Sequence, residues 1–543
     1  MIRNPILTGF NPDPSICRVG DDYYIATSTF EWFPGVQIHH SRNLADWTLV
    51  RRPLDRAELL DMRGEPDSCG VWAPCLTWHD GLFHLVYTDV KRFDGNFKDT
   101  HNYLTTCSTI DGQWSARVYL NSSGFDPSLF HDHDGRKWLV NMVWDHRPDR
   151  SRFGGIVLQE YCSQQQQLIG PIHRIFDGSA VGFTEGPHLY RFGDYYYLLT
   201  AEGGTGYGHA VTLARSKSIT GPYELHPDLH ITTARHAPEA RLQRVGHGDI
   251  VQAADGSFYL AHLCSRPLRG SRLSPLGRES ALRRLSFDAD GWFRLADSDR
   301  LAESAADETG SRTSRYERSY SFDRRTLPMD FQWLRSPEPQ ALFSLEAAPG
   351  RLRLFGRESL GNCFEQALVA RRQTHFCYEA QTQLDFEPVS FQQAAGLVCY
   401  YNAHKFHYLY VSWDERIGKH IGIMSCEADQ SLTASFPMSN ALIPVRAHRP
   451  LHLRVRVREY EMMFAWSYDG SEWQTIPVVL DASLLCDEAG KGESGNFTGT
   501  FVGMCCQDLT GRRLPADFHH FIYRERDLSE ALETPESFAA ALA

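Results

Sequence analysis

The amino-acid sequence contains no apolar run of the roughly 20 residues that a membrane-spanning helix needs. Its start, MIRNPILTGFNPDP, reaches prolines before the apolar core of a secretory signal can form. No pairs of cysteines recur at zinc-like spacing among the 13 cysteines. We therefore expect reduced thiols, a cytoplasmic protein and no membrane partner.

An excess of positive charge is also missing. Lys and Arg number 55 against 67 Asp and Glu, for a formal net charge of -12 at pH 7. Bulk charge of this sign does not attract nucleic acid, and we expect none as a partner. The length, 543 residues with 42% apolar, exceeds what one hydrophobic core serves and predicts at least two domains.

A repeat runs through the first 290 residues or so, with a period of about 58 residues. Its marker is an Asp or Gly turn that leads into an aromatic-rich strand. The five copies are DDYYIATS from Asp21, DGLFHLVYT from Asp80, DGRKWLVNM from Asp134, GDYYYLLTA from Gly193 and DGSFYLAHL from Asp255. Repeated units of three or four short strands are typical of a β-propeller, in which each unit is one blade.

A second segment precedes each aromatic strand by about 8 or 9 residues, as in PDPSI, WAPCL, FDPSLF, TEGPHLY and GHGDIV. The first strands of the blades line the central channel of a propeller, so we expect one residue per unit to converge at one mouth. These residues are Asp13, Trp72, Asp126, Glu185 and His247.

The second half of the chain alternates apolar and charged residues with period two, as in LHLRVRVREY from Leu451. Alternation of this kind, with few helical patterns, predicts an antiparallel, jelly-roll-like β-sandwich. We expect an all-β protein: a propeller over 1–305, a linker over 306–320 and a sandwich over 321–543.

Three acidic residues share the predicted channel mouth: Asp13, Asp126 and Glu185. Each alone could serve a turn or a solvated loop. Their common position in the repeat favours chemistry instead. Hydrolysis of a glycosidic bond needs one protonated acid for the leaving oxygen and one ionised acid for the incoming water. Glutamate has the longer reach for donating the proton, and a neighbouring carboxylate such as Asp126 would raise its pKa.

Aromatic residues near these acids could stack on sugar rings: Phe30, Trp72 and Trp144. Core packing is the alternative for each. His247 could bind a metal, donate a hydrogen bond to substrate or be a core histidine. Arg278, in LGRES, is expected to open the last channel-lining strand, where it would keep one carboxylate ionised; the alternative is a surface arginine.

Taken together, FNPDPSICRVGDDYYIATSTFEWFPGVQIHHSRNLADW, GVWAP, FDPSLF, FTEGPHLY, LGRES and TGTFVGMCCQDLTG resemble glycoside hydrolase family 43, and among its members the two-domain bacterial β-xylosidases. The resemblance covers nearly the whole chain and implies a five-bladed propeller that inverts the anomeric centre. It implies that Asp13 is the general base, Glu185 the general acid and Asp126 the residue that orients the acid and raises its pKa.

The same resemblance implies a sugar pocket. Its expected residues are Phe30, Trp72, Ala73, Trp144, Thr205, His247 and Arg278, with Phe501 of the sandwich closing it. A closed pocket implies exo action on the non-reducing ends of xylobiose and short 1,4-β-xylooligosaccharides. The resemblance also implies a dimer or tetramer.

Several alternatives stay open from the sequence. They are an α-L-arabinofuranosidase, as main or side activity, a fructosidase of the related five-bladed type, and a sugar-binding propeller without catalysis. A structural calcium near His247 is conceivable, because other branches of the family hold one, but GHGDIV offers no clear ligand set. We therefore predict no metal and no required cofactor.

Overall fold

A computed structural model describes residues 2–296, 316–427, 434–490 and 495–530. Contacts divide the chain into two compact units. The first comprises Met1–Arg266 and Arg278–Glu308, and the second comprises Pro267–Gly277 and Thr309–Ala543.

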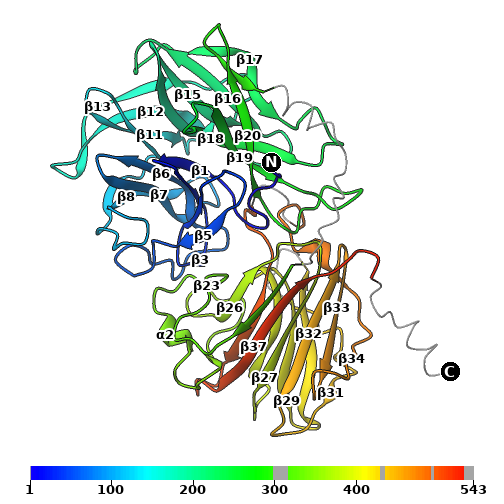
Figure 1. The fold of residues 1–543 in the computed structure, drawn as a ribbon. Helices are drawn as coiled ribbons and strands as arrows, with labels where there is room; N and C mark the ends of the chain where they lie inside the picture. Colours follow the sequence, from blue (N-terminus) through cyan, green and yellow to red (C-terminus); the bar gives the residue numbers. More distant parts are fainter. Residues whose placement is uncertain (1, 297–315, 428–433, 491–494, 531–543) are drawn as a thin grey trace. The chain divides into compact units, whose positions relative to one another are not determined.

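The first unit consists of four-stranded antiparallel sheets that follow one another along the chain, from blue to green in Figure 1. The first two sheets are β1 (Ser15–Val19), β2 (Asp22–Thr27), β4 (Gln37–Ser41) and β5 (Thr48–Arg51), then β6 (Gly70–His79), β7 (Leu82–Arg92), β8 (Asp99–Cys107) and β9 (Val118–Asn121). The short strand β3 (Trp32–Phe33) lies between β2 and β4 in the chain.

The next three sheets repeat this order. They are β10 (Ser128–His131), β11 (Lys137–Trp144), β12 (Phe153–Cys162) and β13 (Gln167–Phe176); β14 (Glu185–Phe192), β15 (Tyr195–Glu202), β16 (Ala210–Ser216) and β17 (Glu224–Thr233); and β18 (Gln243–Gln252), β19 (Phe258–Ser265), β20 (Glu279–Phe287) and β21 (Phe293–Leu295).

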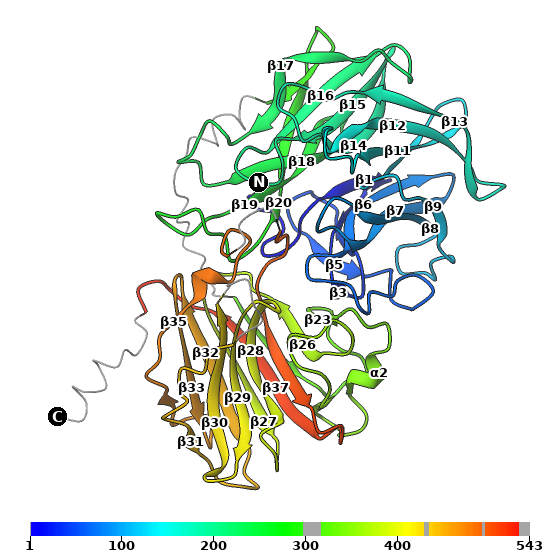
Figure 2. The ribbon, with the colours of Figure 1, turned by 180° about the vertical axis from the view of Figure 1, so that it is seen from behind.

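The first strands of the five sheets contact one another in a closed ring, β1–β6–β10–β14–β18 and back to β1. Figure 2 shows four of them, β1, β6, β14 and β18, near the middle of the first unit as seen from behind. A ring of inner strands with each sheet extending outward is a five-bladed propeller, as predicted from the repeat.

The N-terminal segment closes the ring against the last blade. Leu7 forms a β-bridge with Ser280 of β20, and the Asn11 N–H donates to the Arg278 carbonyl at 2.9 Å. Arg278 therefore precedes the third strand of its blade. The prediction that it opens a channel-lining strand was wrong, because β18 is the inner strand there.

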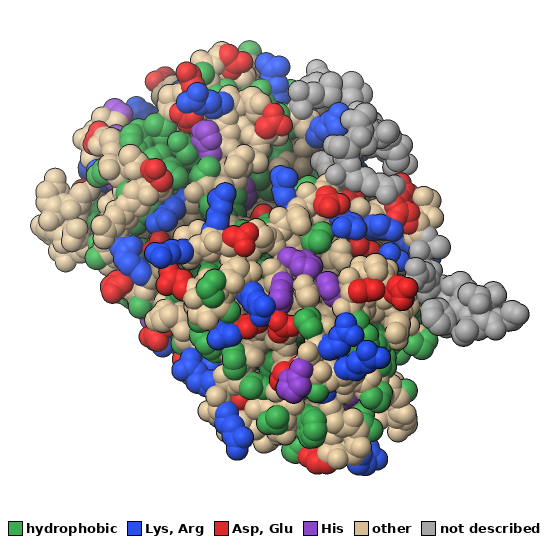
Figure 3. Space-filling view, turned by 60° about the horizontal axis from the view of Figure 1, so that its bottom comes forward, with side chains coloured by type: hydrophobic (Ala, Val, Ile, Leu, Met, Phe, Trp, Pro, Cys, Tyr) green, Lys and Arg blue, Asp and Glu red, His purple; other side chains and the backbone are tan. Residues whose placement is uncertain are grey.

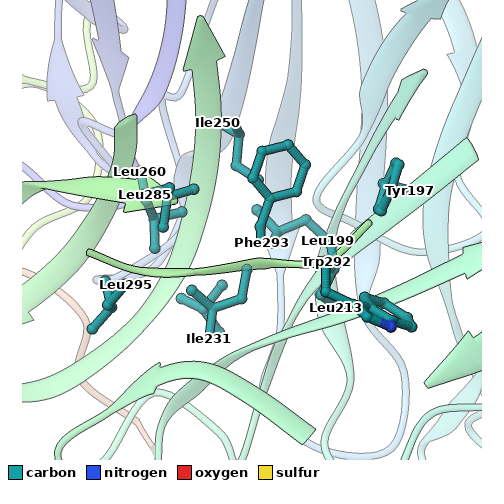
Figure 4. Close-up of a cluster of buried hydrophobic side chains, with 11 residues drawn as sticks. Tyr197, Leu199, Leu213, Ile231, Ile250, Leu260, Leu285, Trp292, Phe293 and Leu295 are labelled. Atoms are coloured by element: carbon teal, nitrogen blue, oxygen red, sulfur yellow. The ribbon is translucent and has the colours of Figure 1, made fainter. Parts of the chain in front are cut away.

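Apolar side chains between blades hold the propeller together. One buried cluster joins the fourth and fifth blades through residues such as Leu199, Leu213, Leu260 and Phe293 (Figure 4). Their alternation with outward residues along each strand gives this close packing, and burial of one such side chain contributes about 1.5–3 kcal/mol.

The second unit is a sandwich of two antiparallel sheets. One sheet contains β22 (Glu317–Ser321), β24 (Phe343–Ser344), β25 (Leu352–Phe355), β27 (Cys377–Asp385), β32 (Leu451–Arg458), β33 (Glu461–Ser467), β34 (Gln474–Thr475), β35 (Leu480–Asp481) and β37 (Pro515–Glu525). The other contains β23 (Phe331–Leu334), β26 (Ala367–Arg372), β28 (Gln393–Asn402), β29 (Lys405–Asp414), β30 (Gly418–Glu427), β31 (Ile443–Pro444) and β36 (Phe501–Asp508).

Two short helical segments belong to the same unit, α2 (Pro339–Leu342) and η1 (Ala482–Leu484). The sandwich predicted from period-two alternation is confirmed. Most of the predicted linker, 306–320, lies outside the described residues, and its last four residues belong to β22.

Three general features follow from the described residues. No helix among them is long and apolar enough to cross a membrane. All 13 cysteines are free thiols. On the face drawn in Figure 3, acidic and basic side chains are interspersed and no continuous basic surface forms.

Candidate active site

One residue per blade adopts a left-handed backbone conformation where the chain enters the channel strand. These residues are Asp13 (φ 55°), Ala73 (φ 33°), Asp126 (φ 54°), Gly186 (φ 55°) and His247 (φ 40°). The first four precede a proline. The prediction that Trp72 and Glu185 share this position with Asp13 was therefore wrong by one residue, because the left-handed residue lies at the X-Pro bond and both side chains come directly before it.

At the same place, the pairing between the first and second strands is interrupted in three of the blades. Register shifts separate Trp72 from Cys75, Glu185 from His188 and Gly246 from Gly248. Such bulges re-aim side chains, and a left-handed non-glycine residue costs about 1–3 kcal/mol, a strain typical of functional sites.

Gly186 is required for a steric reason as well as for its left-handed backbone. A Cβ atom there would lie 3.0 Å from the His247 ring. Glycine, which has no Cβ atom, allows the backbone to pass this close to the ring. The residue directly before it is Glu185.

Asp13 is buried, with 5% of its surface exposed, and is held on both oxygens. Ser28 Oγ donates to Oδ2 at 2.6 Å, and Arg278 Nη1 donates to Oδ1 at 3.0 Å. Ser28 in turn accepts from the Ala73 N–H at 2.8 Å, so its proton is directed to the carboxylate. These contacts fix the orientation of Asp13.

The charges around Asp13 set its protonation state. Burial alone would raise the pKa of Asp13, but Arg278, His247 and the Ser28 hydrogen bond outweigh it and lower the pKa below its ordinary value. Asp13 is therefore an ionised carboxylate at neutral pH.

Glu185 has the opposite character. Burial raises its pKa to about 7; Lys98 and Arg278 oppose that rise, and the charge of Asp13 adds to it. The pKa of Asp126 is also raised well above its ordinary value, by burial and then by Glu185 and Asp13. Asp126 Oδ2 accepts the Gly186 N–H at 3.0 Å, which ties it to the residue after Glu185. Because the two carboxyl groups interact, they titrate as a pair.

Aromatic rings lie beside these acids. Trp72 packs against Phe30 and Phe125 with ring centroids 5.8 and 5.5 Å apart. The Lys98 ammonium lies over four rings, at 4.4 Å from the Trp144 centroid, 5.3 Å from those of Trp72 and Phe125, and 5.5 Å from that of Phe93. The predicted aromatic residues Trp72 and Trp144 therefore contact the Lys98 ammonium, whose positive charge lowers the pKa of Glu185.

The other predicted residues take different places. His247 Nδ1 lies 3.8 Å from Asp13 Oδ1, and burial lowers the pKa of His247 to about 4, so the ring is neutral at pH 7. The Arg278 guanidinium lies 5.2 Å from the Phe30 ring centroid. Thr205 lies in the loop between β15 and β16, where its carbonyl accepts from Arg244 Nε at 2.8 Å.

Phe501 belongs to the second unit. It is the first residue of β36, is fully buried, and lies 5.0 Å from the Arg372 guanidinium. Its expected part in closing a pocket stays a prediction.

Sequence reasoning missed several residues of the site. Ser28 belongs to STF, directly after the first aromatic strand, and gave no signal beyond small polar character. Lys98 lies in the loop between β7 and β8, and Phe125 directly precedes Asp126. The position of Phe125 beside a candidate acid was the one clue available.

The described residues contain no group of three or more His, Cys, Asp or Glu side chains arranged to hold a metal ion. The reactive groups identified in the site are its acids. An ionised carboxylate and a carboxyl group whose pKa is raised can act as base and acid in one reaction.

Comparison with known proteins decides the family. The model of glycosyl hydrolases family 43 matches residues 2–293, which span the propeller strands. The chain belongs to this family. A second model, described as a beta xylosidase C-terminal concanavalin A-like domain, matches residues 319–524 of this family 43 protein.

Individual relatives align over almost the whole chain. Xylosidase/arabinosidase 43B of Humicola insolens is 52% identical over 534 residues, covering 96% of this chain and 97% of the relative. The beta-xylosidase of Bacillus subtilis (strain 168) is 49% identical over 537 residues, covering 97% and 100%. The crystal structure of xylan beta-1,4-xylosidase from Bacillus halodurans C-125 has a TM-score of 0.91 at 48% identity, covering 97% of this chain and 100% of that one.

Proposed function

We propose that this family 43 protein is an inverting, exo-acting β-xylosidase that releases xylose from the non-reducing end of xylobiose and short 1,4-β-xylooligosaccharides. The proposal rests chiefly on one observation: two buried carboxyl groups, Asp13 and Glu185, have pKa values shifted in opposite directions. Names of relatives that align over 96–97% of the chain, a xylosidase/arabinosidase and a beta-xylosidase, support the choice of sugar.

Asp13 is proposed as the general base. Its lowered pKa keeps it ionised, and its hydrogen bonds to Ser28 and Arg278 hold it in one orientation. It would accept a proton from a water molecule as the water oxygen bonds to the anomeric carbon. A single displacement by water inverts that centre, so a β-xyloside yields α-xylose.

Glu185 is proposed as the general acid. A pKa of about 7 leaves it largely protonated below neutral pH. It would donate its proton to the glycosidic oxygen as the bond from that oxygen to the anomeric carbon breaks. Asp126, which accepts from the residue after Glu185, would orient the acid. As a neighbouring carboxyl group it is also proposed to help raise the pKa of Glu185. The reaction adds one water to xylobiose and gives two xylose molecules.

Phe30, Trp72, Ala73 and Trp144 are proposed to form the apolar side of the sugar site, and Thr205, His247 and Arg278 its polar side. Exo action requires a sugar site that is closed at one end, so that only the end of a chain can enter. Beyond the acids, buried polar bonds such as Ser15 to Asp249 join the channel strands, which supports a site closed at that end.

A second activity is proposed on α-L-arabinofuranosides. The observation that favours it is the name of the relative at 52% identity, a xylosidase/arabinosidase. Arabinofuranose and xylopyranose are pentoses with similar hydroxyl patterns, so one polar lining can bind both.

We further propose that the enzyme needs no metal or other cofactor, is cytoplasmic, and forms a dimer or tetramer. Dialysis against EDTA should leave activity unchanged, and full recovery only on added calcium would contradict this. Sedimentation velocity gives the assembly state directly, and a purely monomeric species would overturn that part.

The function is tested by comparing kcat/KM on xylobiose, 4-nitrophenyl β-D-xyloside, 4-nitrophenyl α-L-arabinofuranoside and sucrose. We expect xylobiose turnover, weaker release of arabinose and no action on sucrose. The isosteric variants Asp13→Asn and Glu185→Gln should lose xylobiose turnover by at least about 100-fold while they remain folded. Near-normal turnover by either variant would remove that residue from its role.

A further inference from the structure

A second ring of residues lies in the channel, two positions after the left-handed residue of each blade. It consists of Ser15, Cys75, Ser128, His188 and Asp249. Asp249 is the carboxylate among these five, with 5% of its surface exposed. The proposed chemistry does not use it.

Asp249 links three strands of the channel. Its Oδ2 atom accepts from Ser15 Oγ at 2.9 Å and from the Ile16 N–H at 2.8 Å, both on β1. Its Oδ1 atom accepts from the Tyr190 hydroxyl of β14. His188 Nδ1 of the same strand lies 3.6 Å from Oδ1.

The direction of these bonds is fixed by the groups behind them. Ser15 Oγ accepts the Leu76 N–H of β6 at 3.0 Å, and the Tyr190 hydroxyl accepts the Ile250 N–H at 2.9 Å. Each hydroxyl therefore turns its proton toward Asp249, which only accepts. A carboxyl group, which offers two acceptor oxygens, suits this place.

Polar bonds join every neighbouring pair of channel strands at this ring or within three residues after it. They are Leu76 N–H to Ser15 (β6 to β1), Thr77 with His131 (β6 to β10), Ser128 to the Pro187 carbonyl (β10 to β14), Tyr190 to Asp249 (β14 to β18) and Ser15 to Asp249 (β1 to β18). Asp249 contributes to two of the five links. It stands between the strand that carries Asp13 and the strand that carries Glu185.

We propose that Asp249 is a positioning residue: through Ser15 and Tyr190 it fixes the separation of the base strand and the acid strand. This inference rests on the proposed roles of Asp13 and Glu185. Ser15 lies two residues after Asp13, roughly 7 Å along a strand, and Tyr190 lies five residues after Glu185. Misplacement of a reacting group by about 1 Å can cost about 100-fold in rate.

The test begins with Asp249→Asn, which keeps the shape but replaces one acceptor oxygen by a donor. We expect kcat on xylobiose to fall about 10- to 100-fold while KM changes less than about 3-fold. Asp132→Asn is the matched control, because Asp132 is also buried and accepts from a tyrosine hydroxyl (Tyr196) and a backbone N–H but lies directly after the last residue of β10. It should keep kcat within about 2-fold.

Two milder variants separate positioning from plain stability. Tyr190→Phe loosens the acid strand, so it should impair xylobiose at least about 5-fold more than 2,4-dinitrophenyl β-xyloside, whose leaving group needs no proton. Ser15→Ala loosens the base strand and should impair both substrates equally. These variants carry the test if Asp249→Asn fails to fold.

Wild-type kcat in folded Asp249→Asn, an equal loss in Asp132→Asn, or the same substrate pattern for both hydroxyl variants would overturn the inference. Failure of the proposed function is a separate result, seen in the wild-type enzyme as no turnover of xylobiose. The variants are then compared on whichever aryl glycoside the wild type cleaves.

Discussion

Replacement of Arg278 by methionine should shift the acidic limb of the pH–rate profile upward. Arg278 Nη1 lies 3.0 Å from Asp13 Oδ1, both side chains are buried, and Arg278 is the strongest of the groups that lower the pKa of Asp13. An arginine this close lowers an aspartate pKa by about 1–3 pH units, or about 1.4–4 kcal/mol. Without it, burial is opposed by His247, by the Ser28 hydrogen bond and by His209.

The sign of the shift follows from the role of Asp13. A general base works only when ionised, so activity falls as pH drops through its pKa. In the wild type this limb should lie below the ordinary aspartate value, because the pKa of Asp13 is lowered, and in Arg278→Met it should move up by about 1–3 pH units. If Arg278 only contacted the sugar, its loss would lower kcat/KM at every pH. If its positive charge keeps Asp13 ionised, its loss shifts the acidic limb of the pH–rate profile.

The assay is kcat/KM on 4-nitrophenyl β-D-xyloside from about pH 3.5 to 9, stopped with alkali. Arg52→Met is the control, because Arg52 is a buried arginine of the first blade that donates to the Gln37 amide. Its acidic limb should match the wild type. An unshifted limb in folded Arg278→Met would refute the assignment of Asp13 as a base that Arg278 keeps ionised.

Two further predictions concern Glu185. Its folded-state pKa of about 7 exceeds the ordinary value of 4.5, so the folded state binds more protons and loses stability as pH rises through that window. Glu185→Gln should therefore stabilise the propeller at pH 8 but not at pH 4.5. The gain at pH 8 is at most about 3 kcal/mol in the free energy of unfolding and is seen as a higher Tm. Calorimetry showing equal changes at both pH values would contradict the raised pKa. Lys98→Met removes a cation that lowers this pKa, so the basic limb of kcat should move upward, while Lys98→Arg keeps it in place; a downward shift would reverse the sign assigned to Lys98.

The propeller could be predicted because its signal is periodic. Five aromatic strands recur about every 58 residues, and three acids fall near the same point of the repeat. The phase was misread by one residue at Trp72 and Glu185, because a left-handed backbone leaves no direct trace in sequence beyond the proline that follows it.

Contacts between residues far apart in the chain could not be predicted. Arg278 reaches Asp13 across 265 positions, and Asp249 reaches Ser15 across 234. Closure of the ring brings these pairs together, and no local pattern records it. Lys98 could not be predicted as a site residue for a similar reason, because its four aromatic neighbours come from the second and third blades.

The stereochemistry of the first product tests the central claim most directly. Proton NMR of xylobiose or 4-nitrophenyl β-D-xyloside hydrolysis, recorded within the first minutes, resolves the anomeric signals before mutarotation mixes them. Displacement by a water that Asp13 activates predicts α-xylose as the first-formed sugar. First-formed β-xylose would require a covalent intermediate and would contradict the account.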